Sequence, residues 1–178
     1  MTSPRSSLGC SMDAIYNNVI GIVGWKNSGK TTLVENLVRE LTARGLRVST
    51  VKHAHHDFDI DHPGKDSWRH RVAGAQEVIV ASAHRWAVLH EHRGAPEPSL
   101  ADLLVKLEPC DLVLVEGFKY GPHRKIQVRR AEAPGTLLPP EQAIIAVATD
   151  EPALAGSYRF LSIDDIGAIA DFVSNAPG

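Results

Sequence analysis

Short apolar runs alternate with segments of helical periodicity along most of the 178-residue chain. Nearly continuous apolar runs of about four to eight residues are typical of strands that are buried on both faces of a parallel sheet. Apolar residues three and four positions apart indicate helices with one buried face. Because strands and helices alternate, we expect an α/β fold: a doubly wound, mostly parallel sheet flanked by helices, with a hairpin insertion. The pattern predicts strands over 19–23, 46–51, 112–115, 126–130 and 143–148, a hairpin over 77–81 and 85–90, and helices over 33–41, 67–73, 100–107 and 164–173.

Composition narrows the function classes further. Apolar content of 43% and charged content of 22% are ordinary for one soluble globular domain, and no apolar run approaches the length of a membrane span. The net charge of −2 gives no electrostatic reason to expect nucleic acid or a membrane as a partner. There is no signal-peptide pattern, and Cys10 and Cys110 match no metal or redox spacing, so we expect a cytoplasmic protein. Residues 1–16 are Ser-rich and aperiodic, which predicts a disordered tail before a single domain over 17–178.

The strongest motif is a phosphate-binding loop, G-W-K-N-S-G-K-T-T, at residues 24–32. It lies between the first predicted strand and the first predicted helix, an order that directs backbone N–H groups toward an anion. We expect Lys30 to reach the β- and γ-phosphates of a nucleoside triphosphate and the Thr31 hydroxyl to bind Mg²⁺. The sequence therefore predicts a P-loop NTPase-like domain whose nucleotide-binding residues are Gly24, Asn27, Ser28, Gly29, Lys30, Thr31 and Thr32.

A carboxylate ends the strand predicted over 112–115. Glu116 would lie at the carboxyl edge of the sheet, the edge on which the phosphate loop also lies. A carboxylate there can bind Mg²⁺ directly or through water, and Gly117 lets the backbone pass close to a ligand. We therefore predict Glu116 as a second metal ligand, although the longer side chain leaves an indirect role open.

Histidine and aspartate are concentrated between residues 52 and 70, where five of the nine histidines occur. One interpretation is a transition-metal site, since imidazole binds Zn, Ni and Cu. A second is a switch segment whose aspartates, Asp57 among them, approach the nucleotide-bound Mg²⁺. A solvated polar loop is the third. The spacing matches no closed zinc pattern, so the switch hypothesis with Asp57 as a metal ligand is preferred.

Three further features are open to more than one interpretation. Asp150 follows the strand over 143–148 and is placed to accept two hydrogen bonds from guanine, but a turn aspartate before Pro152 explains it equally well. Basic residues at 123–125 and 129–130 suggest either an anion-binding surface or, more commonly, a solvated charged face. Trp25, at a free position of the loop pattern, either covers a ligand or packs.

Taken together, these motifs resemble the molybdopterin-guanine dinucleotide biosynthesis protein B family, MobB. The resemblance covers about residues 19–150 and rests on the phosphate loop, on V-K-H-A-H-H-D-F-D-I-D with P-G-K-D-S-W-R-H-R-V-A-G-A, and on L-V-L-V-E-G-F-K. It implies a GTP-binding adaptor with weak Mg²⁺-dependent GTPase activity. The implied partners are the guanylyltransferase that joins GMP to molybdopterin, molybdopterin itself, and a second copy of the chain in a homodimer.

Two other functions fit the motifs. The His/Asp stretch suggests a nickel or zinc metallochaperone GTPase, and the P-loop with its carboxylate suggests a small-molecule kinase. No residue is an evident catalytic base, which favours slow hydrolysis over rapid turnover.

Overall fold

The computed structural model of the chain describes residues 15–54, 58–133, 135–151 and 158–176. The chain divides into two compact units. One comprises Met1–His53 and Leu100–Gly178, and the other comprises Ala54–Ser99. Nearly all of the tail expected at 1–16 lies outside the described residues.

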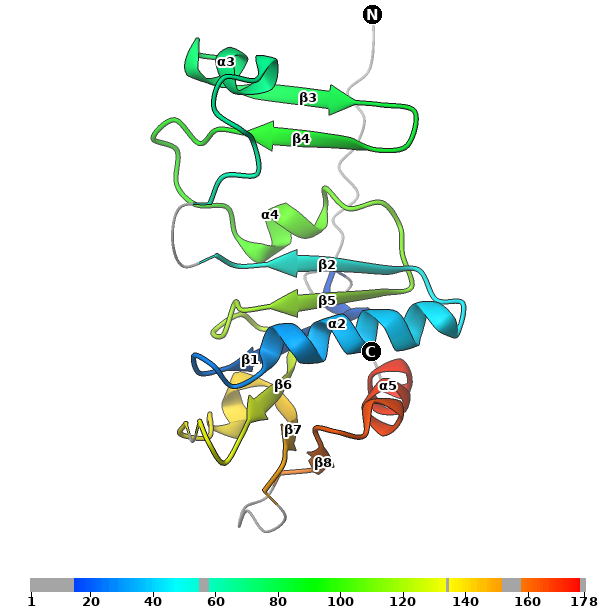
Figure 1. Ribbon diagram of the computed structural model, residues 1–178. Coiled ribbons are helices and arrows are strands. Elements are labelled where there is room, and N and C mark those ends of the chain that lie inside the picture. Colours follow the sequence, from blue (N-terminus) through cyan, green and yellow to red (C-terminus); the bar gives the residue numbers. More distant parts are fainter. Residues whose placement is uncertain (1–14, 55–57, 134, 152–157, 177–178) are drawn as a thin grey trace, which may run out of the picture. The chain divides into compact units, whose positions relative to one another are not determined.

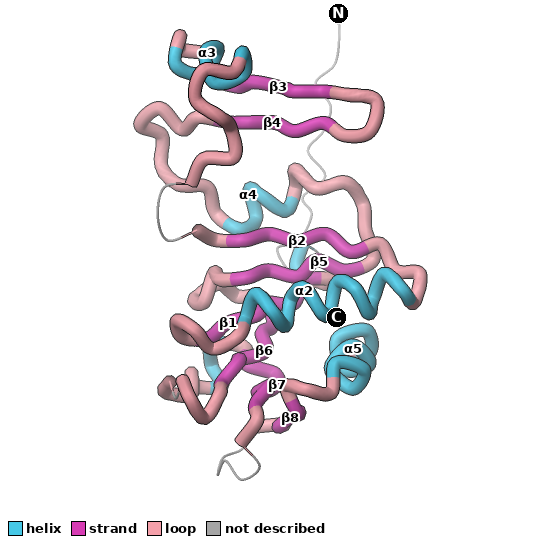
Figure 2. The backbone as a smooth tube through the Cα atoms, in the orientation of Figure 1, coloured by secondary structure: helices cyan, strands magenta, loops and turns pink. Residues whose placement is uncertain are grey.

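A six-stranded parallel sheet forms the centre of the first unit (Figures 1 and 2). Its order is β2-β5-β1-β6-β7-β8, and every pair of neighbouring strands is parallel. After β1, the chain forms β2 and β5 on one side of this strand and then β6, β7 and β8 on the other. The topological switch point therefore lies at the carboxyl end of β1, where open α/β sheets bind ligands. The doubly wound α/β class is confirmed. The bounds are β1 Val19–Gly24, β2 Val48–Lys52, β5 Leu112–Glu116, β6 Arg124–Arg129, β7 Ile144–Thr149 and β8 Phe160–Ser162.

Helices cover the sheet because its strands are apolar on both faces. On one face, Leu33, Leu37 and Leu41 of α2 (Lys30–Ala43) pack with Ile20 and Ile22 of β1. Helix α5 (Ile166–Asn175) joins the same core, next to α2. On the other face, α4 (Leu100–Leu104) packs on β1 and β5, and the 3₁₀ turn η1 (Pro140–Gln142) precedes β7. Within the described ranges, no helix has the length and apolar character that crossing a membrane requires.

The strand β6 differs from its sequence-based interpretation. A solvated charged face was the commoner explanation of its basic residues, but β6 lies between β1 and β7, and Lys125 and Gln127 are fully buried. The Lys125 ammonium donates to the backbone carbonyls of Gly121, His123 and Gln142 at 2.5–2.8 Å. The side-chain amide of Gln127 donates to the Thr136 carbonyl and accepts from the Leu138 N–H. Full hydrogen bonding therefore allows polar side chains in a central strand.

Two other boundaries differ. The helix predicted over 100–107 ends at Leu104, although Leu107 still packs against the same core cluster. Strand β8 was not predicted, because its three residues are too few to show a period.

The second unit contains α3 (Asp66–Val72) and the antiparallel hairpin of β3 (Glu77–Ala81) and β4 (Trp86–His90), as the pattern predicted. Its charged residues centre on Arg71, whose guanidinium pairs with Asp59, Asp61 and Glu91 at 2.8–3.3 Å. The pKa of Arg71 is raised by its hydrogen bonds to these carboxylates, first of all that of Glu91. Two aspartates of the expected switch segment are thus engaged by Arg71.

Candidate functional site

The loop after β1 has the backbone conformation that a phosphate-binding loop needs. Asn27 and Gly29 lie in the left-handed region, with φ of 63° and 90°, and Gly29 caps α2. A Cβ atom at Gly24 would lie 2.5 Å from the carbonyl oxygen of Val128 on the neighbouring strand. The hydroxyl of Ser28 is buried and has no hydrogen-bond partner among the described residues. Sequence, turn and helix N-terminus therefore agree on an anion site.

Lys30 is the first residue of α2, and its side chain folds back over the loop. Its ammonium donates to the carbonyl oxygen of Trp25 at 2.7 Å. Burial lowers the pKa of Lys30, the Glu116 carboxylate opposes that shift, and the nearby ammonium groups of Lys119 and Lys52 add to it. Several positive charges therefore surround the loop, which favours an anionic ligand.

The structure brings Thr31 and Glu116 together, although 85 residues separate them. The Thr31 hydroxyl donates to Glu116 Oε1 at 2.8 Å, because β5 lies directly beside β1 and both strands end at this edge. Adjacent ligands of an octahedral Mg²⁺, each about 2.0–2.1 Å from the ion, lie about 3 Å apart. The two oxygens thus have the chemistry and the spacing of neighbouring Mg²⁺ ligands.

Around Glu116, the structure adds residues that the sequence motifs did not single out. The ammonium of Lys52, at the end of β2, lies 3.5 Å from Glu116 Oε2. His53 stacks on Phe118 with ring centroids 4.7 Å apart, so the first histidine of the His/Asp stretch lies beside the carboxylate strand. The positions of Lys52 and His53 beside Glu116 follow from the parallel register of β2 and β5, which pairs Lys52 with Glu116 and which the sequence does not show.

Asp150 lies after β7 and is held by the chain itself. It accepts a hydrogen bond from the Ala131 N–H at 2.9 Å, and Arg130 lies 3.4 Å away. Arg130 also lies against the phosphate loop, because its Nε would be 3.0 Å from a Cβ atom at Gly29. A pocket opens here, lined by Gly29, Thr32, Leu33, Asn36, Arg130, Ile163, Asp164 and Ile166.

Trp25 is 40% exposed, and its ring is held at the surface by contacts with two other segments. Its Nε1 donates to the Thr136 carbonyl at 2.9 Å, and any side chain at Gly135 would overlap the ring. The ammonium of Lys119 lies over the ring, 3.8 Å from its centre. Trp25 therefore links the phosphate loop to the segment before η1 and to the turn after β5.

Comparison with known proteins assigns this site to a family. Residues 19–150 match the family described as Molybdopterin guanine dinucleotide synthesis protein B, MobB. The chain belongs to the MobB family. It is 44% identical over 160 residues to the molybdopterin-guanine dinucleotide biosynthesis adapter protein of Haemophilus influenzae, covering 88% of each chain. The adapter protein of Escherichia coli is 42% identical over 160 residues, which cover 87% of this chain and 90% of the relative.

Solved MobB structures share the fold. The MobB homolog from Bacillus stearothermophilus is 30% identical, with a TM-score of 0.65 over 89% of this chain and 96% of the other. Bacillus subtilis MobB is 25% identical, with a TM-score of 0.70 over 90% and 98%. The resemblance drawn from the sequence motifs is thereby confirmed, together with the P-loop fold.

The His/Asp stretch provides no metal centre in the described part of this MobB-family chain. No group of three or more His, Cys, Asp or Glu residues there could hold a metal ion. Three residues of the stretch, His55, His56 and Asp57, lie outside the described residues, so Asp57 as a metal ligand stays a prediction.

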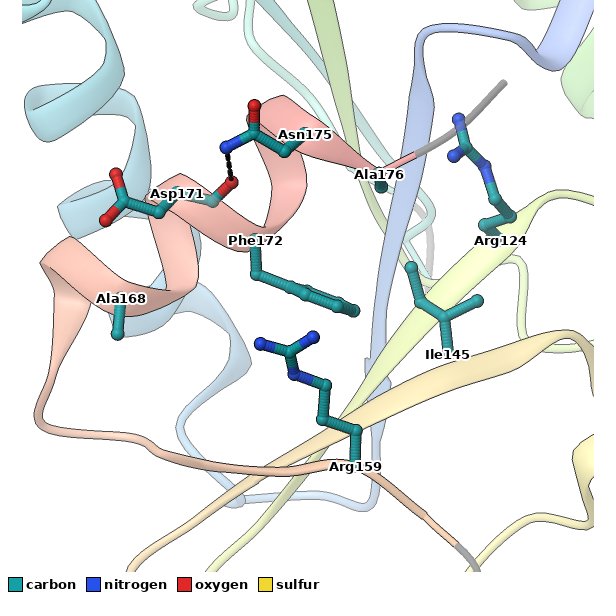
Figure 3. Close-up of a pocket in the computed structure, with 8 residues that line it drawn as sticks. All are labelled: Arg124, Ile145, Arg159, Ala168, Asp171, Phe172, Asn175 and Ala176. Atoms are coloured by element: carbon teal, nitrogen blue, oxygen red, sulfur yellow. Dashed lines mark hydrogen bonds between the residues drawn. The ribbon is translucent and has the colours of Figure 1, made fainter.

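A further pocket lies at the opposite edge of the MobB sheet. Figure 3 shows Ile145 of β7 beside the Phe172 ring, and Arg124, the first residue of β6, at the far side of the pocket. The Arg159 guanidinium lies over the Phe172 ring, 4.7 Å from its centre. The phosphate loop instead follows the carboxyl end of β1. This pocket is therefore separate from the candidate nucleotide site.

Proposed function

We propose that this chain is a GTP-binding adapter protein in the biosynthesis of molybdopterin guanine dinucleotide. The observation that carries the proposal is the phosphate loop with Thr31 and Glu116 in hydrogen-bond contact beside it. The role as an adapter follows from the MobB family and from the names of its relatives in Haemophilus influenzae and Escherichia coli. A cytoplasmic location stays a prediction.

The residues around the loop fit a Mg²⁺–nucleotide complex. We expect the backbone of the loop from Gly24 to Thr32 to hold the phosphates and Lys30 to exchange the Trp25 carbonyl for phosphate oxygens. Thr31 and Glu116 would hold Mg²⁺, which neutralises phosphate charge when bound. Glu116 is the carboxylate nearest to Thr31, but Thr31 and Lys52 already engage it, so it is poorly placed to act as a general base. At most slow GTP hydrolysis follows.

The pocket beside Gly29 gives the nucleoside a place next to the phosphates. Arg130 and Asp164 supply charged groups at its edge, and Asp150 is joined to Arg130 by an ion pair. A carboxylate can accept two hydrogen bonds from guanine, which adenine cannot donate. We therefore propose Asp150 as the residue that selects guanine.

Replacing Asp150 with Ala should lower GTP affinity at least about tenfold and leave ATP affinity unchanged, because two hydrogen bonds to a charged acceptor are lost. Isothermal titration calorimetry with GTP and ATP, each with and without Mg²⁺, measures this and tests nucleotide binding as a whole. If neither nucleotide binds to the unmodified protein, the proposed function is wrong.

The matched variant is Asp164→Asn, at the other carboxylate beside the same pocket. It should retain the preference for GTP. If Asp164→Asn loses the preference and Asp150→Ala keeps it, base recognition belongs to Asp164.

We also propose that the protein is a homodimer formed through the β3–β4 hairpin. Ile79 pairs with Val88 and Ala81 pairs with Trp86, so these side chains share one face of the hairpin. Ile79, Trp86 and Val88 are 66%, 64% and 42% exposed. An isolated two-stranded hairpin is marginally stable, and an exposed apolar patch of this kind is typical of a protein interface.

Sedimentation velocity should therefore give twice the 19.3 kDa mass of the chain. Trp86→Asp should shift the protein to the monomer, because a charge would be buried in the apolar interface. Val105→Asp is the control, since Val105 is 71% exposed but lies outside the hairpin. A monomeric mass for the unmodified protein contradicts the dimer.

The adapter role requires a partner enzyme. We propose the guanylyltransferase that joins GMP to molybdopterin, with molybdopterin as a further ligand of the complex. Affinity-tagged protein loaded with Mg²⁺–GTP should retain the purified guanylyltransferase, and the unloaded protein should retain less of it. If neither the loaded nor the unloaded protein retains the guanylyltransferase, the proposal of this partner is wrong.

A further inference from the structure

Three lysines, Lys30, Lys52 and Lys119, lie close together beside the phosphate loop, but only two of them have hydrogen-bond or ion-pair partners among the described residues. Lys30 donates to the Trp25 carbonyl, and Lys52 pairs with Glu116. Lys119 has neither kind of partner within the described residues, and its ammonium lies on the ring of Trp25. A cation on an aromatic face is held only weakly when the site is partly open to water. Lys119 is therefore available for a stronger, anionic partner.

The backbone before Lys119 has an unusual conformation, and the Lys119 side chain lies against Trp25 of the phosphate loop. Gly117 and Phe118 both lie in the left-handed region, with φ of 101° and 48°. Such a conformation is unfavourable for Phe and persists only where its surroundings impose it. The surroundings here are the His53 ring stacked on Phe118 and the Gly117 N–H, which donates to the Ile22 carbonyl of β1 at 3.3 Å. The turn after Glu116 is thus fixed against the strand that carries the phosphate loop.

Trp25 connects two of the lysines. Its backbone carbonyl accepts from Lys30, and its ring lies under Lys119. The ring itself is fixed by the hydrogen bond to Thr136 and by close contact with Gly135. A phosphate that binds Lys30 would replace the Trp25 carbonyl as its partner. The Lys119 ammonium, on the Trp25 ring, would then lie close to the same phosphate.

We propose that Lys119 binds the terminal phosphate of the nucleoside triphosphate and that the Trp25 ring holds this lysine while no nucleotide is bound. The inference rests on the proposed nucleotide binding and identifies the residue that distinguishes triphosphate from diphosphate. Lys119 lies three residues after Glu116, which would hold Mg²⁺, and that ion would neutralise phosphate charge when bound. The ammonium groups of Lys30 and Lys119 both contact Trp25, one at its backbone carbonyl and the other on its ring, which agrees with two ammonium groups that share one anion.

The test uses Trp25 as an internal reporter. The chain has three tryptophans, and replacing Trp68 and Trp86 with Phe leaves Trp25 as the sole emitter. Mg²⁺–GTP should change the Trp25 emission because Lys119 leaves the ring, and Mg²⁺–GDP should change it much less. In Lys119→Met, the emission without nucleotide should already resemble that of the GTP-bound form. Emission that does not respond to GTP in a variant that binds GTP would overturn the proposal.

Affinity provides the second measurement. Lys119→Met should lower GTP affinity about tenfold, the value of one charge-assisted hydrogen bond, and change GDP affinity by less than about twofold. Lys119→Arg should retain most of the difference between GTP affinity and GDP affinity, because arginine is also a positively charged donor. Lys106→Met removes an exposed lysine after α4 and should change neither affinity.

Loss of nucleotide binding and loss of the Lys119 contact give different results in these measurements. If the unmodified protein binds neither GTP nor GDP, the proposed function is wrong, and the role of Lys119 is wrong with it. If it prefers GTP and Lys119→Met keeps the same preference, the nucleotide site stands and the role of Lys119 is overturned.

Discussion

Replacement of Lys30 with Ala is expected to lower the affinity for Mg²⁺–GTP at least about a hundredfold. Charge-assisted hydrogen bonds to phosphate contribute about 1.5–3 kcal/mol each, and Lys30 is placed to make two, one to the β- and one to the γ-phosphate. A loss of about 3 kcal/mol or more corresponds to at least about a hundredfold in the dissociation constant. Calorimetric titration of the variant with Mg²⁺–GTP measures the effect.

The fold should survive this substitution. Lys30 lies at the start of α2, and within the described part of the chain its ammonium donates only to the Trp25 carbonyl, whereas the helix is anchored by Leu33, Leu37 and Leu41. Circular dichroism should therefore show an unchanged melting curve. Lys26→Ala removes the same charge from an exposed position of the same loop and should change affinity by no more than a few fold. Full GTP affinity in Lys30→Ala would refute the assignment of the phosphate loop.

The arrangement of the candidate phosphate site was predictable because its parts are local or share one sheet edge. The loop motif fixes residues 24 to 32 by spacing alone. Glu116 is far away in the sequence, but a carboxylate at the end of a buried strand must lie at the edge where parallel strands end. The contact between Thr31 and Glu116 at 2.8 Å follows from these two rules and the position of β5 beside β1.

Long-range pairing of charges was not predictable. Asp59 and Asp61 were read as part of a switch segment, yet Arg71 pairs with both, because α3 and the segment before it fold together. In β6, the basic residue Lys125 suggested a solvated face, yet three carbonyls converge on its ammonium, two from the segment before β6 and one from η1. A sequence shows the charge of a residue, but the partner that permits burial is set by the tertiary fold.

The contact between Trp25 and Lys119 could not be predicted for another reason. The loop motif treats position 25 as free, and the motif L-V-L-V-E-G-F-K contains Lys119 but does not show where its side chain lies. Their contact depends on two consecutive left-handed residues, Gly117 and Phe118. A left-handed Phe is rare enough that no sequence rule anticipates it.

Lowering the pH from about 6.5 to about 4 should destabilise the protein by about 3 kcal/mol through His123 alone. The side chain is 1% exposed, and neither ring nitrogen has a hydrogen-bond partner among the described residues. Burial lowers its pKa to about 4, and the nearby charge of Lys125 adds to the shift. In the unfolded chain the imidazole has its ordinary pKa of about 6.5. The unfolded state therefore binds more protons between these values, and stability falls as the pH falls.

Urea unfolding at a series of pH values measures this slope. His123 stacks on Tyr16 and fills the space where a Cβ atom at Gly21 would lie, so His123→Leu keeps an apolar side chain of similar size there. Aspartates with lowered pKa values, such as Asp61, also lose stabilisation in acid, but they do so in both proteins. The difference between the two curves isolates the imidazole, and the variant should lose less stability between pH 6.5 and 4. Parallel curves would mean that His123 is protonated in the fold, which would require an anionic partner beside a ring that faces Lys125 and backbone.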